Sequence, residues 1–173
     1  MIMASMSSDD KPWKTDLARA SAQRREEVLK SLEETIKKAP SFEEALQKSV
    51  EVMKRKFARF SSVTTYVADG ENLAVHTAIE RPEGPERVRS DEGPLAKAAH
   101  KETPTVVSDL SSAEDWAAVG LTKGSCLVAP VRTDAGLWAI LEIWSDFRDA
   151  FAPQDVRLVG QVAAALAKKT PAP

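Results

Sequence analysis

The residues best suited to chemistry in this chain lie between Ser125 and Ser145, a stretch that ends in GLWAILEIWS. Successive side chains of a β-strand point to opposite faces, so one face of this segment carries Ala139, Leu141 and Ile143. The other face carries Trp138, Ile140, Glu142 and Trp144. Two indoles flanking a carboxylate mark this face as a binding pocket, a subunit contact or a solvated surface.

Glu142 is the most informative of these residues, because a carboxylate in an otherwise apolar strand is unfavourable to bury unless it is paired or hydrogen-bonded. It can accept a hydrogen bond from a ligand amine, from Tyr66 or from an arginine such as Arg89. A structural role and a binding role are equally open from the sequence alone.

Cys126 is the single cysteine, which excludes an intrachain disulfide and a clustered thiolate zinc site and fits a reducing cytoplasm. The two histidines, His76 and His100, do not stand at metal-ligand spacing. No Gly-rich phosphate loop or Ser-His-Asp set is found. We therefore expect no metal, no cofactor and no catalytic residue.

The composition describes one globular domain. With 173 residues, 43% hydrophobic and 29% charged, the chain can build one sizeable core. A net charge of -2, from 24 basic and 26 acidic residues, gives no reason to expect nucleic acid or an anionic membrane as a partner. Because no segment approaches the roughly 20 apolar residues of a membrane span or has the pattern of a signal peptide, we expect a cytoplasmic protein.

The first predicted element is a helix over residues 16–39, after an irregular N-terminus over residues 1–15. Its second half has a narrow apolar stripe and several Glu-Lys pairs four residues apart, which stabilise a helix. A helix with so few apolar residues is either a solvated lead-in or one side of a dimer contact. Pro40 ends it.

The rest of the chain alternates between helical and strand periods. Ser41 and Glu44 form a capping box that starts a second helix with apolar residues at spacings of three and four. Asp69-Gly70 predicts a hairpin between two strands, and Pro153 opens a final helix. A short helix at 94–102, a strand at 104–110 and two strands at 125–131 and 136–145 complete an α+β fold with an antiparallel sheet.

Three segments in this order resemble the GAF domain, a small-molecule-sensing family related to PAS domains. They are GPLAKAAHKETPTVVSDL, GSCLVAPVRTDAGLWAILEIWS and FAPQDVRLVGQVAAALA. The resemblance covers residues 41–169, leaving 170–173 as a tail. It implies a central antiparallel sheet with the N- and C-terminal helices on one face and a ligand pocket on the other.

The alternation of each strand then selects the side chains on the pocket side. Thr64 points there, and Val63, Thr65 and Val67 point to the helices. Cys126 and Val128 face the pocket and Leu127 the core, while on the second strand Leu73, Val75 and Ile79 go one way and His76 the other. With Trp116 from the pocket cover, the candidate ligand-binding residues are Tyr66, His76, Trp116, Cys126, Trp138, Glu142 and Trp144.

The chain is also distantly similar to the free methionine-(R)-sulfoxide reductases, GAF proteins whose chemistry needs a nucleophilic and a resolving cysteine. The positions that resemble their cysteines fall in the 81–87 loop, around Leu95 and in 111–120, and none of these is cysteine here. Cys126 and Trp144 replace two of their acidic ligands, and Glu142 keeps one. We therefore expect no reductase activity.

Three functions remain open. The leading hypothesis is a non-catalytic regulatory module that binds an unknown small organic ligand and signals through its terminal helices. The alternative is a homodimeric interaction scaffold, joined through its N- and C-terminal helices, whose pocket is filled by Trp138 and Trp144 themselves. Redox sensing through Cys126 needs an exposed thiol with a lowered pKa.

Overall fold

The computed structural model describes residues 12–171, and the side chains from residue 18 onward. Of the N-terminal segment 1–15, where an irregular structure was expected, residues 1–11 lie outside the described residues, and residues 12–15 instead form the start of the first helix. The elements, in chain order, are α1 (Pro12–Lys38), α2 (Phe42–Lys56), β1 (Ser62–Asp69), β2 (Asn72–Ile79), β3 (Arg87–Arg89), α3 (Gly93–Ala99), β4 (Thr105–Val107), the 3-10 helices η1 (Leu110–Ser112) and η2 (Glu114–Val119), β5 (Ser125–Thr133), β6 (Gly136–Ser145) and α4 (Pro153–Ala167).

The strands form one six-stranded sheet in the order β3-β2-β1-β6-β5-β4, and all neighbours are antiparallel. The predicted hairpin joins β1 to β2, with Asp69 opposite Asn72 and Gly70 in the left-handed region at φ +60°. The α+β class predicted from the sequence is confirmed.

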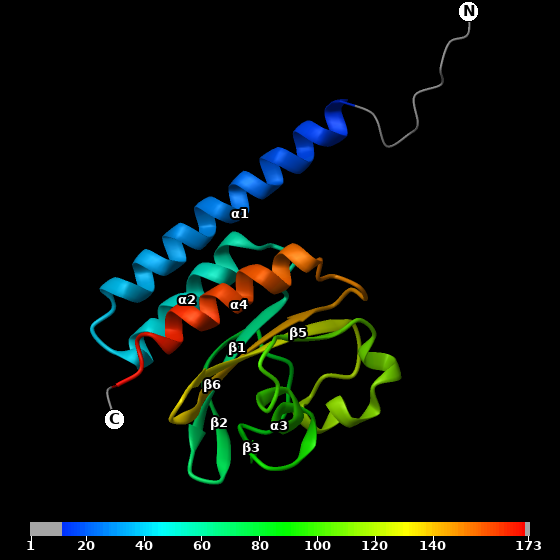
Figure 1. Cartoon of the computed structure of the whole chain (residues 1–173). Coiled ribbons are helices and arrows are strands. Elements are labelled where there is room, and N and C mark those ends of the chain that lie inside the picture. The colour runs from blue at the N-terminus through cyan, green and yellow to red at the C-terminus, as the bar shows by residue number, and fades with distance from the viewer. Residues whose placement is uncertain (1–11, 172–173) are drawn as a thin grey trace, which may run out of the picture.

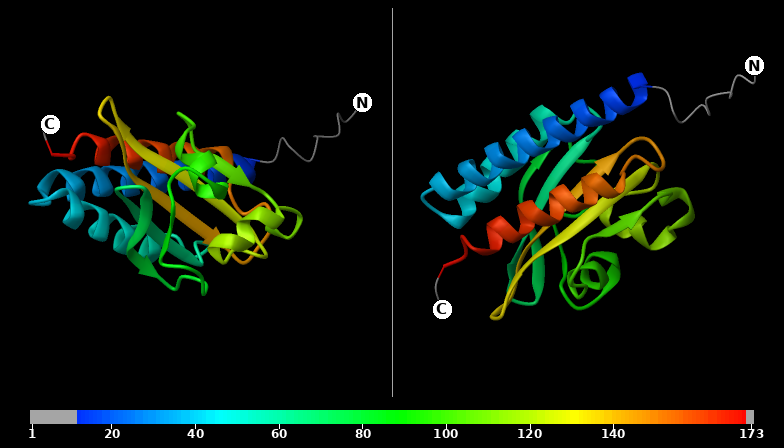
Figure 2. Two further views of the ribbon diagram at one scale, coloured as in Figure 1. Left: turned by 90° about the horizontal axis from the view of Figure 1, so that it is seen from below. Right: turned by 45° about the horizontal axis from the view of Figure 1, so that its top comes forward.

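One face of the sheet is covered by helices. Helices α2 and α4 lie directly on the sheet, and α1 packs over both of them (Figures 1 and 2). The Ser41 hydroxyl caps α2 by accepting the Glu44 backbone N–H at 3.1 Å. The apolar stripe of α1 is buried at Val28, Leu32 and Ile36, as its spacing predicts.

The other face of the sheet is enclosed by the chain from residue 80 to residue 124, which we call the cover. Besides the two edge strands β3 and β4 of the sheet, it contains α3, η1 and η2, and these helices lie below the sheet in Figure 1. Side chains of the cover and the sheet form a second apolar cluster, the inner core, whose buried members are Tyr66, Leu73, Leu95, Ala98, Ala99, Leu110, Trp116, Val119, Leu121, Cys126, Val128 and Ile140.

Among the described residues, no helix is both long enough and apolar enough to span a membrane.

Candidate functional site

The strand alternation predicted for β1, β5 and β6 is confirmed over most of their length. Tyr66, Cys126 and Ile140 belong to the inner core, and Val63, Leu127 and Leu141 belong to the core beneath the helices. Glu142 lies two residues from Ile140 and is completely buried. The antiparallel register sets it directly opposite Thr64.

The prediction for Trp138 is wrong, because a β-bulge reverses the alternation. Val131 pairs with Ala139 and Arg132 pairs with Leu137, so Trp138 is the extra residue of β6. Its ring packs edge-on against Phe42 of α2 with centroids 6.1 Å apart. Trp138 therefore lies on the helix side and does not face the cover.

A second bulge makes the prediction for His76 wrong. Thr65 pairs with Thr77 and Tyr66 pairs with Val75, which leaves His76 as the extra residue of β2. Its exposed side chain shares a hollow with residues of α2, and its Nδ1 lies 2.9 Å from the Thr77 hydroxyl.

The same bulge splits the side chains of β2. Leu73 and Val75 join the inner core, whereas Ile79 packs beneath the helices. The expectation that these three share one face is therefore also wrong.

The other two candidate tryptophans do lie on the cover side. Trp116 of η2 is only 5% exposed and is part of the inner core. Trp144 is half-buried at the edge of that core, and its indole N–H donates to the Lys123 carbonyl at 2.8 Å. Both rings thus pin the cover to the sheet.

Glu142 is a buried acid without a hydrogen-bond partner. Among the residues that the structure describes, neither carboxylate oxygen has a partner in hydrogen-bond geometry, although the Tyr66 hydroxyl lies close enough to lower the pKa of the acid. The hydroxyl of Thr64 across the strand pair is also unpartnered. Burial raises the pKa of Glu142 to about 7, although the nearby Arg81 guanidinium and Tyr66 hydroxyl partly lower it. The carboxyl is therefore largely protonated below neutral pH.

Arg81 is the residue of this site that the sequence did not reveal. Its guanidinium donates to the Tyr66 hydroxyl at 3.3 Å and to the carbonyls of Gly84 and Pro85 at 3.2 and 2.5 Å. The guanidinium carbon lies 5.9 Å from the centre of the Tyr66 ring. Arg89, the arginine considered from the sequence, is instead half-exposed and pairs with Asp91.

Tyr66 sits between the acid and the arginine. Burial, followed by the charge of Glu142, raises the pKa of Tyr66 to about 12, and its bond with Arg81 opposes this shift. The phenol therefore stays neutral at physiological pH. The site thus combines a carboxyl, a phenol and a guanidinium on the enclosed face of the sheet.

Cys126 is fully buried in the inner core. Burial, with a smaller contribution from Glu142, raises the pKa of its thiol. The exposed, acidic thiol required for redox sensing is therefore not what the structure shows. Between residues 12 and 171, no cluster of His, Cys, Asp and Glu is placed to hold a metal ion.

A hollow of about 430 Å³ opens on the outer side of the cover. It lies between β3, the start of α3 and η2, and Leu95 and Val119 line it. Both residues also belong to the inner core. The hollow is therefore separated from the inner core by these two side chains.

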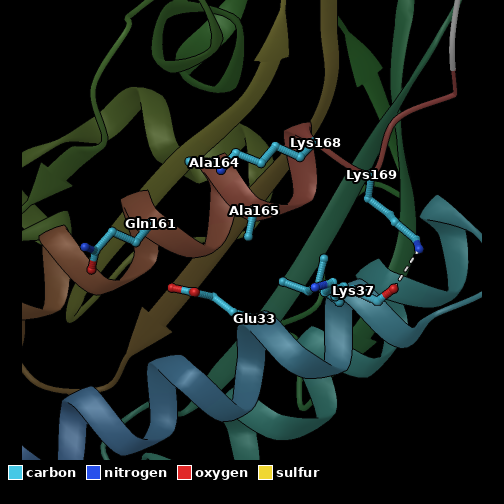
Figure 3. Close-up of a pocket in the computed structure, with 8 residues that line it drawn as sticks. Glu33, Lys37, Gln161, Ala164, Ala165, Lys168 and Lys169 are labelled. Atoms are coloured by element: carbon cyan, nitrogen blue, oxygen red, sulfur yellow. Dashed lines mark hydrogen bonds between the residues drawn. The ribbon is translucent and has the colours of Figure 1, made fainter.

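Two further hollows, of about 580 and 380 Å³, follow each other along the boundary between α1 and α4 and share Gln161. We call them together the helix groove. Figure 3 shows its larger part, where Glu33 of α1 faces α4 and Lys169, just after the end of α4, donates to the Lys37 carbonyl at 3.0 Å. Ile36 lines this part of the groove.

Comparison with known proteins agrees with this architecture. The chain superposes on a free methionine-R-sulfoxide reductase from Neisseria meningitidis in complex with its substrate, with a TM-score of 0.74, 24% identity, and coverage of 84% of this chain and 87% of that one. A putative GAF sensor protein from Burkholderia vietnamiensis superposes with a TM-score of 0.77 and 17% identity, and the match covers 86% of this chain and 94% of that one. The GAF domain of a phosphoenolpyruvate-protein phosphotransferase from Coxiella burnetii superposes with a TM-score of 0.71 and 19% identity, and the match covers 86% of this chain and 93% of that one.

These structural likenesses, all under 25% identity, establish the fold and not the ligand. No curated protein sequence matches the chain closely enough to count as a relative. The family model described as GAF domain matches residues 39–168, which is most of the chain. The chain therefore belongs to the GAF domain family.

Proposed function

We propose that this protein is a non-catalytic regulatory module that binds a small organic ligand between the sheet and the cover. The ligand places a hydrogen-bond donor, such as an amine, against Glu142. The observation that carries the proposal is the complete burial of this carboxyl with neither oxygen hydrogen-bonded among the described residues. Buried polar groups in proteins nearly always have a partner, and a ligand supplies one here.

The surroundings of Glu142 support a ligand that is mainly apolar apart from its donor. The inner core contributes aromatic and aliphatic side chains such as Tyr66, Trp116 and Ile140, and small-molecule sites are mostly apolar with a few placed polar groups. Entry requires the cover to move, because Trp116 and Leu95 of the cover are buried in the inner core against the sheet.

The single cysteine supports the absence of catalysis. The reductases in this fold family use paired thiols, whereas this chain has only Cys126, whose thiol pKa is raised by burial. A thiol held in its neutral form is a poor nucleophile. The positions that resemble the catalytic cysteines of the reductases hold no cysteine in this chain, and Cys126 does not replace them.

The raised pKa of Glu142 makes the affinity for a cationic ligand depend on pH. Below pH 7 the carboxyl is largely protonated, so an ammonium group must first displace that proton. Affinity for a protonated amine therefore rises as the pH rises toward and through 7. A neutral donor, such as an amide, lacks this dependence.

The test is a thermal-shift screen of small amines, amides and amino acids against the wild-type chain and Glu142→Gln. Ligands that raise the Tm of the wild type should leave that of Glu142→Gln unchanged. Glu71→Gln, which changes an exposed residue in the β1–β2 turn, is the matched control and should keep the full shift. Equal shifts in wild type and Glu142→Gln would overturn the proposal.

The helix groove favours a second function, a homodimeric scaffold. Its α1 wall carries both signs of charge, with Glu26 and Glu33 beside Arg25 and Lys37, whereas the side formed by α4 and the residues after it carries Arg157, Lys168 and Lys169. Two copies related by a two-fold axis can set Glu26 and Glu33 of one copy against Arg157 and Lys168 of the other. We therefore propose a second copy of this chain as the occupant of the groove.

Light scattering distinguishes the scaffold from a monomer. The intact chain should have twice its monomer mass of 18.8 kDa, and Ala164→Glu, which places a charged side chain in the groove, should restore the monomer. Ala117→Glu, at an exposed alanine of the cover, is the control and should remain a dimer. A wild-type chain that is monomeric at high concentration contradicts the scaffold.

A further inference from the structure

Helix α1 has two parts that differ in how they are held. From Val28 to Lys38 its apolar stripe packs on the rest of the protein. Every residue from 18 to 24 is exposed, and this end of the helix projects beyond α2 and α4 (Figures 1 and 2). An unsupported helical segment of this length is marginally stable in water.

Two neighbouring arginines stand at the boundary between these parts. Arg24 donates to the carbonyl of Lys56, at the end of α2, at 3.3 Å. Arg25 is 20% exposed, and its Nε lies 3.4 Å from Oδ1 of Asp155, in the first turn of α4. The arginines thus tie α1 to the two helices beneath it.

Asp155 is 1% exposed and serves three segments at once. Its Oδ2 accepts the Ala152 backbone N–H at 2.8 Å and so caps α4. Its Oδ1 accepts a short bond from Arg59, in the turn between α2 and β1, and faces Arg25. The contact with Arg25 is the weaker one, because its Nε has no hydrogen bond within the described residues.

The region around Asp155 also joins the ends of β1 and β6, the two strands that carry the candidate site. Arg59 precedes β1, and β6 leads through residues 146–152 to Asp155. The Asp146 backbone N–H donates to the Ser61 hydroxyl at 3.1 Å, which ties these ends together. These bonds form a continuous connection from the strands that carry Thr64 and Glu142 to the carboxylate that holds α1.

We propose that Asp155 and Arg25 form a latch: together with the bond from Arg24 to the Lys56 carbonyl, their ion pair holds the first half of α1, and its loss lets residues 18–24 open more often while the second half stays packed. Arg59 competes for the same oxygen and keeps Asp155 in place when the latch opens. That ligand binding operates the latch rests on the proposed function. The latch itself exists in the ligand-free chain and is tested there.

The test is amide hydrogen exchange of the full chain, comparing wild type with Arg25→Gln. The variant should exchange at least about tenfold faster over residues 18–27 and at the wild-type rate in β6 and α4, since only the local opening is affected. Arg19→Gln, at an exposed position of the same helix, is the matched control and should leave all rates unchanged.

Asp155→Asn provides a second variant, because its amide oxygen can still cap α4 while the charge is lost. It should accelerate the same segment of α1. Unchanged exchange over residues 18–27 in Arg25→Gln overturns the latch, and so does an equal increase in α4 and β6, which would make Arg25 a general stabiliser. Because no ligand is added, neither result bears on ligand binding at Glu142.

Discussion

Glu142 of β6 and Thr64 of β1 face each other across an antiparallel strand pair, and within the described chain neither side chain has a hydrogen-bond partner. Each unpaired buried polar group destabilises a fold by about 1–3 kcal/mol. The sheet also buries the hydroxyl groups of Ser62, Thr65, Ser125 and Ser145. Glu142 is the residue of this buried polar set that can carry a charge, and it is for this group that we propose a ligand donor as the missing partner.

The first prediction concerns pH. Burial raises the pKa of Glu142 from 4.5 to about 7, so between these values the native state keeps a proton that the unfolded chain has lost. Stability should therefore fall as pH rises from 4.5 to 7 and then level off, by about 3 kcal/mol in total for this group. Urea unfolding of wild type and Glu142→Gln should show the variant gaining relative stability over this window. Parallel pH profiles contradict the prediction.

The two half-buried tryptophans of β6 should behave differently when shortened. Trp138→Ala removes a ring packed on Phe42 and should destabilise the chain by about 2 kcal/mol without affecting a ligand-induced rise in Tm. Trp144→Ala, at the edge of the inner core, should remove that rise. Loss of the ligand effect in Trp138→Ala alone would place the ligand on the helix side.

The closure of the cover depends on Gly120, which has φ +86° and lies against residue Glu83. A Cβ at this position collides with the Glu83 carbonyl oxygen, so Gly120→Ala should destabilise the chain by more than the roughly 1–2 kcal/mol of left-handed backbone strain alone.

Gly70→Ala is the matched comparison for this effect, because Gly70 has φ +60° and no neighbouring atom within 4 Å of the added Cβ. It should show the strain without the collision. Equal changes in Tm for the two variants would mean that contact between the 80–86 loop and η2 does not close the cover.

Cys126 should be chemically inert in the native protein. Its side chain is completely buried and its thiol pKa is raised, so a maleimide should label the native chain roughly 100-fold more slowly than the urea-unfolded chain, since reaction requires opening. Similar rates in the two states would return redox sensing to consideration.

Much of this fold could be predicted, because alternation and helical spacing follow directly from burial on one side. The faces of Tyr66, Cys126 and Glu142 were predicted for this reason. The faces of His76 and Trp138 were not, since each is the extra residue of a bulge. A bulge depends on how two strands pair, which the sequence of one strand does not record.

Contacts made by loops and helix ends were equally hidden from the sequence. Arg81 follows β2 in a loop without periodicity, and it meets Tyr66 only because the loop folds back over the sheet. Arg25 and Asp155 are 130 residues apart in the chain, and only the packing of α1 on α4 brings them together. Such pairs carry no local signal.

The most direct test of the account is a crystal structure of the chain with a ligand taken from the thermal-shift screen. We predict a donor atom of the ligand within about 3 Å of a Glu142 carboxylate oxygen, between the sheet and the cover, with Trp116 displaced from its present position. A ligand bound elsewhere, with the Glu142 carboxylate still unpartnered, would contradict the account.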